Sequence, residues 1–434
     1  MPLGYTLTEA NSHHDVRAPV TLEAVRTFVL LAIAGCNFNP AGAPDDGSRG
    51  SSDGVISPTC SDGQKDGDET GVDCGGSCPA CTACTDHTLP PSTNVDATQW
   101  SASFLTSPSW SCTAAGTTTI DSQAGTVVSS TCALGTLDIT NDVPQLAGGP
   151  NAMVVRLTGL SVTNGHVLEL RGDKPIIFLV AGDVTIDSGG TIDASAVGAT
   201  PGPGGSIGAE CPTGTGASAS SSGWGGGGGG FGTPGGQGCY NIVNGGMVDG
   251  SDALAPLRGG CSGGTNSAGG QGGAGGGAIE ISASGAIAIG ATATAVVVAS
   301  GGGGPASSSG GVGGGSGGAI LLVASAMPTF GSGGAARVNG GAGSSGCSGC
   351  SNNDSGQDGH ATDNSQATDA SGMPGGGNGN DRGRVGGMAY VIGGASPVTL
   401  PGSMTTAQSG GRGGGGGGGG RIQITTGTTI PACD

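Results

Sequence analysis

Short runs of β-branched and small aliphatic residues alternate with polar residues along most of this chain. Each run is bounded by Gly, Asn or Asp, as half-buried strands usually are. Three such runs in succession, separated by a Gly or Ala turn and then by Gly-Gly, form a unit that recurs. The units lie at Val154–Leu170, Ile176–Ser195, Ala278–Ser300 and Ala319–Gly341, with a final run at Arg421–Ile430.

Units of about 20 to 25 residues with three short strands predict an all-β fold, a right-handed parallel β-helix. In this fold each strand pairs with its equivalent in the next unit, so Ile176, Ile279 and Ile320 would stack in one inward column. The body would span 151–434, after an irregular β or capping region at 85–150. The alternative is an antiparallel sandwich, which predicts Asn-Gly or Asp-Gly hairpins, and these dipeptides occur only sporadically.

The chain of 434 residues contains 99 glycines, many of them in tracts that interrupt the units at 196–277, 301–318 and 342–420. All three interruptions follow the third strand of a unit, so they would lie along one edge of the solenoid. Glycine loses more backbone entropy on folding than any other residue, so these tracts do not fold by themselves. They would be either disordered loops or extended segments that stack on one another and pair their backbone groups.

The charge balance excludes one class of partner. The formal net charge of -18 repels nucleic acid, so no nucleic-acid binding is expected. Beyond the N-terminus no uninterrupted apolar run approaches the roughly 20 residues of a membrane-spanning helix, which predicts a body outside the bilayer.

The N-terminus has the order of an export signal: Arg26, the apolar run 27–34, small residues and then Cys36. The tetrad Ile33-Ala34-Gly35-Cys36 resembles a bacterial lipobox. That resemblance implies lipidation of Cys36, removal of residues 1–35 as a signal peptide and membrane contact through the lipid alone. Asn37 then favours the outer membrane or cell surface. The alternative is a buried apolar helix with an incidental cysteine.

The segment before the apolar run is longer and more acidic than such signals usually are. It contains Glu9, Asp15 and Glu23, so translation would start downstream of Met1, near Val20 or Val25. After Cys36, residues 36–59 are rich in Pro, Gly, Ser and Asp and predict a flexible tether.

A cysteine-rich element follows at 60–84 (CSDGQKDGDETGVDCGGSCPACTAC). It resembles a short C-x-DG-x-x-(N/D)-G-x-ET-x-VDCGG-x-C element of secreted myxobacterial proteins, a resemblance that implies export and no particular catalysis. Two disulfides among its cysteines are expected, in one of three connectivities, and zinc bound by the CPAC and CTAC pairs is the alternative. These cysteines are Cys60, Cys74, Cys78 and Cys81. Its acidic residues either lie in solvated turns, with no cofactor, or bind calcium: Asp62, Asp66, Asp68 and Asp73.

Further cysteines suggest local pairs. Cys112 with Cys132 and Cys347 with Cys350 are close in sequence, whereas Cys211, Cys239 and Cys261 share one glycine-rich insertion with no pairing implied.

Candidate chemistry is sparse. Ser316 satisfies G-x-S-x-G, but polyglycine produces that pattern by chance and no helix is expected after it. None of the five histidines has metal-binding spacing, and His166 is expected to be a surface residue at the start of a strand. Cleavage of a sugar chain would need carboxylates together with a cation. The nearest candidates belong to the unit Ile176–Ser195 and to the segment just before it: Glu169, Arg171, Lys174, Asp183, Asp187 and Asp193. They lie mainly at turns of a single unit, so no cleft over several units is expected.

The sequence therefore favours a lipid-anchored cell-surface protein with a structural or adhesive role and no evident catalytic site. A polysaccharide-binding or polysaccharide-cleaving β-helix is the alternative, because fold alone does not determine function. Ice binding is disfavoured because Thr-x-Thr does not recur at unit spacing.

Overall fold

The computed structural model describes the strand-forming body and parts of the segments around it. The described residues are 76–78, 88–89, 91–96, 107–132, 137–206, 211–221, 223–238, 242–307, 310–346, 358–359, 388–392, 398–400, 413–427 and 430–431. All belong to one compact unit, Pro58–Asp434. Every regular element among them is a β-strand, so the all-β prediction is confirmed. In this part of the chain no helix is long and apolar enough to cross a bilayer.

Each predicted unit forms three short strands. They are β6 (Ala152–Leu157), β7 (Gly159–Val162) and β8 (His166–Arg171); β9 (Ile176–Val180), β10 (Val184–Ile186) and β11 (Thr191–Asp193); β12 (Ala278–Ala283), β13 (Ile287–Ile289) and β14 (Ala295–Val298); β15 (Ala319–Ala324), β16 (Thr329–Phe330) and β17 (Gly334–Arg337).

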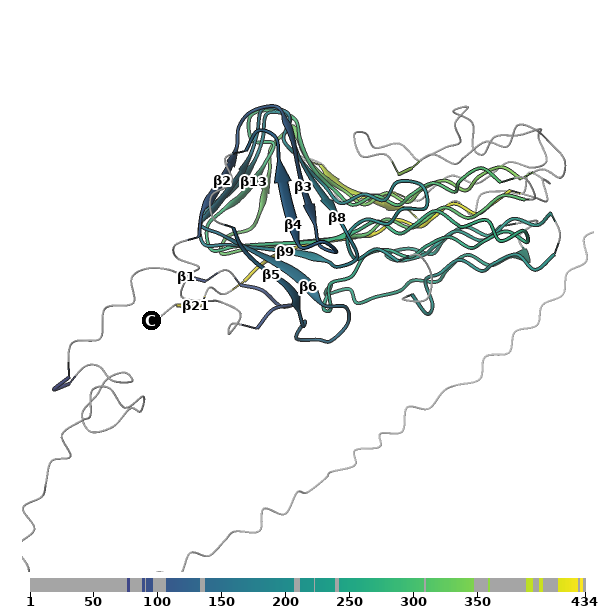
Figure 1. The fold of residues 1–434 in the computed structure, drawn as a ribbon, viewed down its shortest axis with the longest axis horizontal. Coiled ribbons are helices and arrows are strands. Elements are labelled where there is room, and N and C mark those ends of the chain that lie inside the picture. Colours follow the sequence, from purple (N-terminus) through teal and green to yellow (C-terminus); the bar gives the residue numbers. More distant parts are fainter. Residues whose placement is uncertain are drawn as a thin grey trace, which may run out of the picture. The chain divides into compact units, whose positions relative to one another are not determined.

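Equivalent strands of successive units pair in parallel, which contradicts the sandwich alternative. The first strands form one sheet in the order β6, β9, β12, β15 and β20 (Arg421–Thr426). The second strands follow β2 (Ser109–Cys112), and the third strands follow β3 (Gly116–Asp121). Figure 1 shows the three sheets around a common interior, with the glycine-rich segments running out from one corner.

Antiparallel strands flank two of the three sheets, those of the first and third strands, whereas the sheet of second strands is parallel throughout, and none of the three is closed. At the start of the stack, β4 (Thr126–Ser129) pairs with β3 and β5 (Asp138–Val143) pairs with β6. At its end, β18 (Met388–Ile392) pairs with β17, and β19 (Val398–Leu400) pairs with β18. A separate short ribbon joins β1 (Thr88–Leu89) to β21 (Ile430–Pro431).

The interior is built from aliphatic columns. Ile279 is in register with Ile176 on one side and with Ile320 on the other, and all three are fully buried. The predicted isoleucine column is therefore confirmed. Full burial of such a side chain stabilises the fold by about 1.5–3 kcal/mol. Stacked aliphatic side chains can therefore stabilise the body without a large aromatic core. Trp110 and Phe178 are the largest side chains in this cluster.

The first strands β6, β9, β12 and β15 are buried on both faces, because other chain segments cover the outer side of their sheet. Asn94 organises this cover: its Nδ2 donates to Leu254 O (3.0 Å), its Oδ1 accepts from Leu257 N (3.1 Å), and its carbonyl accepts from Leu146 N. Beneath it lies Glu280 on β12, which is fully buried and accepts from Asn94 Nδ2 at 2.8 Å. Burial raises the pKa of the Glu280 carboxyl.

Glycine and its neighbours form the corners between second and third strands. Asn164 and Gly165 both have positive φ (55° and 72°), as do Ser188 and Gly189 one unit later (51° and 82°). Gly165 N donates to Ser188 O, so consecutive corners stack. The Asn-Gly dipeptide thus turns the chain from one sheet to the next and closes no hairpin.

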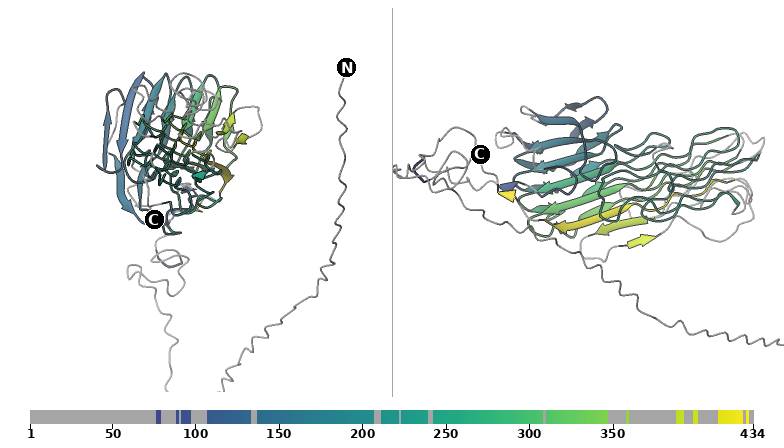
Figure 2. Two further views of the ribbon diagram at one scale, coloured as in Figure 1. Left: turned by 90° about the vertical axis from the view of Figure 1, so that its right-hand side faces the viewer. Right: turned by 90° about the horizontal axis from the view of Figure 1, so that it is seen from below.

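The described parts of the glycine insertions pack into an ordered bundle. Figure 2 shows these segments side by side beyond the strands. Their amides bond to other segments with a period of three residues. In segment 226–231 the donor–acceptor pairs are Gly226–Gly311 and Gly229–Gly314, Gly227–Ala217 and Gly230–Gly214, and Gly228–Gly236 and Phe231–Thr233. Segment 313–318 repeats the pattern with Gly264, Gly415, Gly302, Cys261, Gly418 and Ala299 as successive acceptors.

A three-residue period is that of an extended polyproline-II-like helix, which makes no hydrogen bonds within itself. Each segment therefore directs successive amides to three different neighbours. A Cβ atom on most of these glycines would lie closer than 3.0 Å to a neighbouring backbone, as for Gly313 against Gly227. The interpretation as stacked polyglycine is confirmed for the described tracts, and the composition follows from their close approach.

Candidate functional site

A cavity lies where the third strands meet the glycine bundle. It has a volume of about 1050 Å³ and is open to solvent, and we call it the groove. Its charged lining residues come from the adjacent strands β3, β8 and β11, from the turn after β8 and from the first glycine insertion: Asp121, Glu169, Arg171, Asp173, Asp193 and Arg258. Gln123, Ser195, Thr200 and Ser206 add further polar groups, and the lining contains no aromatic side chain.

Strand register brings the carboxylates of the groove together. On β8, Leu168 and Leu170 point inward, so Glu169 and Arg171 point outward; on β11, Ile192 points inward and Asp193 outward. Glu169 is in register with Asp193 and with Thr119 of β3. Since neighbouring strands are about 4.8 Å apart, the three side chains form one row across the strands. Asp121 is likewise in register with Arg171.

Hydrogen bonds hold this row in place. Glu169 forms an ion pair with Arg171, and the Thr119 hydroxyl donates to Glu169 Oε2 at 3.3 Å. Asp193 Oδ1 accepts from Ser195 N at 2.8 Å, and Asp121 Oδ1 accepts from Gln123 N at 2.9 Å. Among the described residues neither aspartate uses its Oδ2 in a hydrogen bond. One oxygen of each aspartate is therefore fixed, and the other is available to a ligand.

The opposite wall of the groove is anchored to the glycine bundle. Arg258 pairs with Asp249 (2.5 Å), and its guanidinium lies 6.0 Å from the centre of the Phe231 ring. Arg421 approaches the same ring at 5.7 Å, so two cations flank a fully buried aromatic side chain. A disulfide joins Cys211, which lines the groove, to Cys261 inside the bundle.

The predicted carboxylates and cations divide into two groups. Glu169, Arg171 and Asp193 line the groove. The others maintain turns: Asp183 Oδ1 accepts from Ala286 N at 2.8 Å, and Lys174 lies 3.3 Å from Asp173 and 3.5 Å from Asp142.

Asp187 has the clearest structural role of the turn residues. It accepts from the hydroxyl and amide of Thr292 (2.6 and 3.0 Å) and from Ala293 N (2.8 Å). The Thr292 hydroxyl, together with these amides, lowers the pKa of Asp187 although the side chain is buried. Asp187 therefore joins two consecutive units.

The expectation that no cleft spans several units was wrong. Asp121, Asp173 and Arg258 were missed, because β3 belongs to a region interpreted as irregular and Arg258 lies in a glycine-rich insertion. Asp121 did leave a signal. The tripeptide Thr-Ile-Asp occurs at 119–121, 185–187 and 191–193, and in the first and last of these copies the aspartate ends a third strand.

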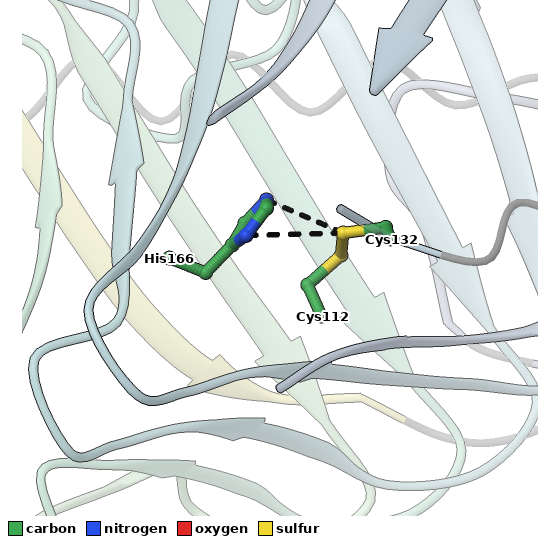
Figure 3. Close-up of side chains that lie close together, drawn as sticks. All are labelled: Cys112, Cys132 and His166. Carbon is green, nitrogen blue, oxygen red and sulfur yellow. Dashed lines mark hydrogen bonds between the residues drawn. A yellow bond between two sulfur atoms is a disulfide. The ribbon is translucent and has the colours of Figure 1, made fainter. Parts of the chain in front are cut away.

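A second cluster contradicts the prediction for His166, which is fully buried and not a surface residue. Figure 3 shows its imidazole facing Cys132, which forms a disulfide with Cys112. The distance from His166 Nε2 to Cys132 Sγ is 3.2 Å. The suggested local pair is thus present. Its histidine neighbour was not foreseen, because the three residues come from strands that are far apart in sequence.

Only some of the remaining predicted site residues lie in the part of the chain that the structure describes. Cys78 is buried and disulfide-bonded. Ser316 is fully buried and its Oγ accepts from Cys261 N at 2.8 Å, so it is part of the bundle and no nucleophile. Outside the described residues lie Cys36, Cys60, Cys74, Cys81, Cys239, Cys347, Cys350, Asp62, Asp66, Asp68 and Asp73.

No protein-family model, curated protein or solved structure matches this chain.

Proposed function

We propose that this chain is an exported, lipid-anchored surface protein that adheres to an extracellular polysaccharide through the groove. The observation that carries the proposal is the row of outward polar side chains on three adjacent strands, bordered by the bundle wall. Carboxylates accept hydrogen bonds from sugar hydroxyls, and the guanidiniums of Arg171 and Arg258 donate to sugar oxygens. An open groove that crosses several strands suits an extended chain better than a small ligand.

The parallel sheets support the finer architecture that we propose, a right-handed parallel β-helix. Three sets of equivalent strands pair in parallel in the order of the chain. Crossovers between parallel strands of one sheet are right-handed in nearly all proteins, and for this reason we propose a right-handed solenoid. The glycine bundle would stiffen one edge of this solenoid and form one side of the groove.

Anchoring by Cys36 is the proposed route to the cell surface. The tether 36–59 and the cysteine-rich element 60–84 would hold the body away from the membrane. Replacement of Cys36 by Ser is expected to move the protein from the membrane fraction to the soluble fraction of the producing cells. Continued membrane association of this variant would contradict lipidation.

Polysaccharide cleavage is a second candidate, favoured by one observation. Glu169 and Asp193 lie in register on strands about 4.8 Å apart, and paired carboxyl groups about 5 Å apart are typical of retaining glycosidases. We rank it second because Glu169 is already paired with Arg171. Binding needs no proton transfer, whereas cleavage also needs a carboxylic acid that donates one.

The test is binding of the purified full chain to a panel of insoluble polysaccharides, measured by co-sedimentation. The double variant Glu169→Gln/Asp193→Asn is expected to weaken binding at least tenfold. Asp142→Asn is the matched control, because Asp142 is exposed and does not line the groove. Equal binding by wild type and the double variant would contradict the proposal. New reducing ends or unsaturated sugars in the supernatant would favour the second candidate.

A further inference from the structure

The buried cluster of Cys112, Cys132 and His166 is assembled from three strands at the start of the stack. Cys112 ends β2, Cys132 follows β4, and His166 begins β8. Their ligand atoms, two sulfurs and one imidazole nitrogen, all lie within 4.8 Å of one another (Figure 3). Cys112 and His166 are buried, and Cys132 is half-buried, so the cluster is reached from the side of Cys132.

Hydrogen bonds determine which nitrogen of His166 faces the sulfurs. Nδ1 lies 2.9 Å from the carbonyl oxygen of Ala114, which only accepts, so Nδ1 carries the proton and donates. In the neutral ring Nε2 then holds the free electron pair. Nε2 lies 2.9 Å from the Thr118 hydroxyl and 3.2 Å from Cys132 Sγ. A backbone carbonyl that fixes the tautomer in this way is the usual outer partner of a metal-binding histidine.

We propose that reduction of the Cys112–Cys132 disulfide converts this cluster into a site for a zinc-like divalent ion. A dithiol reductant supplies two electrons and two protons and is itself oxidised to a disulfide, which leaves two thiols. Metal binding then releases those two protons, and the ion is held by the two thiolates and His166 Nε2. Thiolate and imidazole ligands are those that zinc prefers in proteins, and water completes the tetrahedron.

The consequence is a cross-link that persists in both redox states. The disulfide joins the end of β2 to the segment after β4, and the ion would join the same two segments and add β8. The first strands of the stack would therefore stay attached when the disulfide is reduced. This inference is independent of the groove, because none of the three residues lines it.

The experiment uses the full chain, reduced with dithiothreitol and desalted without oxygen, with Co²⁺ as the probe. Other cysteines are reduced as well, so the readout is a difference. The variant Cys112→Ser/Cys132→Ser is expected to bind one equivalent of Co²⁺ less than wild type, with a matching loss of thiolate-to-cobalt absorption. His166→Gln is expected to weaken the binding of Co²⁺ at this site at least tenfold. Equal stoichiometry in wild type and the double variant would overturn the proposal.

A second measurement needs no variant. Wild-type protein is alkylated with iodoacetamide after reduction, with and without Zn²⁺, and the modified peptides are mapped by mass spectrometry. We expect Zn²⁺ to slow alkylation of Cys112 and Cys132 at least tenfold. Alkylation of both at the same rate with and without the ion, or failure of the reductant to expose either thiol in the folded protein, would refute the site.

Discussion

Gly227 and Gly313 are 86 positions apart in the sequence, yet no side-chain atom fits between their backbones. A Cβ atom on Gly313 would lie closer than 3.0 Å to the Gly227 carbonyl oxygen. Gly313 N donates to Gly264 O at 3.0 Å in the same layer of the bundle. The glycine content is therefore a packing requirement of neighbouring segments, and it can be tested position by position.

Replacement of Gly313 by Ala is expected to destabilise the protein by about 1–3 kcal/mol, because the new methyl group forces two backbones apart. The control is Gly270→Ala, because the three atoms nearest to its Cβ would be side-chain atoms of Asn266 and Ser307, at 3.2 Å, and no backbone atom. We expect the control to change stability by less than about 1 kcal/mol. Equilibrium unfolding in urea measures both, and equal effects would contradict the packing argument.

Removal of the Cys211–Cys261 disulfide should loosen the bundle and the groove wall. The bond links two cysteines that are 50 residues apart in sequence. Its removal is expected to lower the free energy of unfolding by about 2–5 kcal/mol. We expect the variant Cys211→Ser/Cys261→Ser to unfold at lower temperature under non-reducing conditions. Amide exchange measured by mass spectrometry should rise in 211–264 and stay unchanged in β6–β8. Faster exchange in β6–β8 alone would contradict this assignment.

Asp187→Ala should weaken the connection between two consecutive units. The carboxylate accepts three hydrogen bonds from Thr292 and Ala293, so a loss of about 2–3 kcal/mol is expected at neutral pH. The folded state lowers the pKa of Asp187, and its contribution is therefore present above the unfolded value of about 3.9 and lost as the pH falls below it. The difference between wild type and variant should shrink in acid. Asp173→Ala, with an exposed side chain, is the control and should change stability by at most about 0.5 kcal/mol.

Glu280 should give the opposite pH dependence. Burial raises its pKa, so between the unfolded and folded values the unfolded chain binds fewer protons and stability falls as the pH rises. In Glu280→Gln this decline is absent. We expect the unfolding free energy of wild type relative to the variant to decrease as the pH rises from 4 to 8. A constant difference over this range would show that Glu280 does not titrate in the fold.

The strand units and their parallel stacking could be predicted from the sequence. Alternation at period two marks one inward face per strand, and Ile176, Ile279 and Ile320 recur at equivalent positions, so local pattern is sufficient for these features. The sequence also predicts that every glycine insertion follows the third strand of a unit, because the three strands of each unit can be recognised in the sequence. Two of the three side chains in the groove's row, Glu169 and Asp193, could be identified as candidates for the same reason.

Only the tertiary structure decided which segments are neighbours. In the bundle each glycine faces a different segment from the one before it, and polyglycine carries no side chain that encodes the partner. The groove needs Arg258 from an insertion opposite Asp121 from an earlier strand, and the burial of His166 needs β2, β4 and β8 together. Such contacts depend on where distant segments pack, which no local pattern of residues specifies.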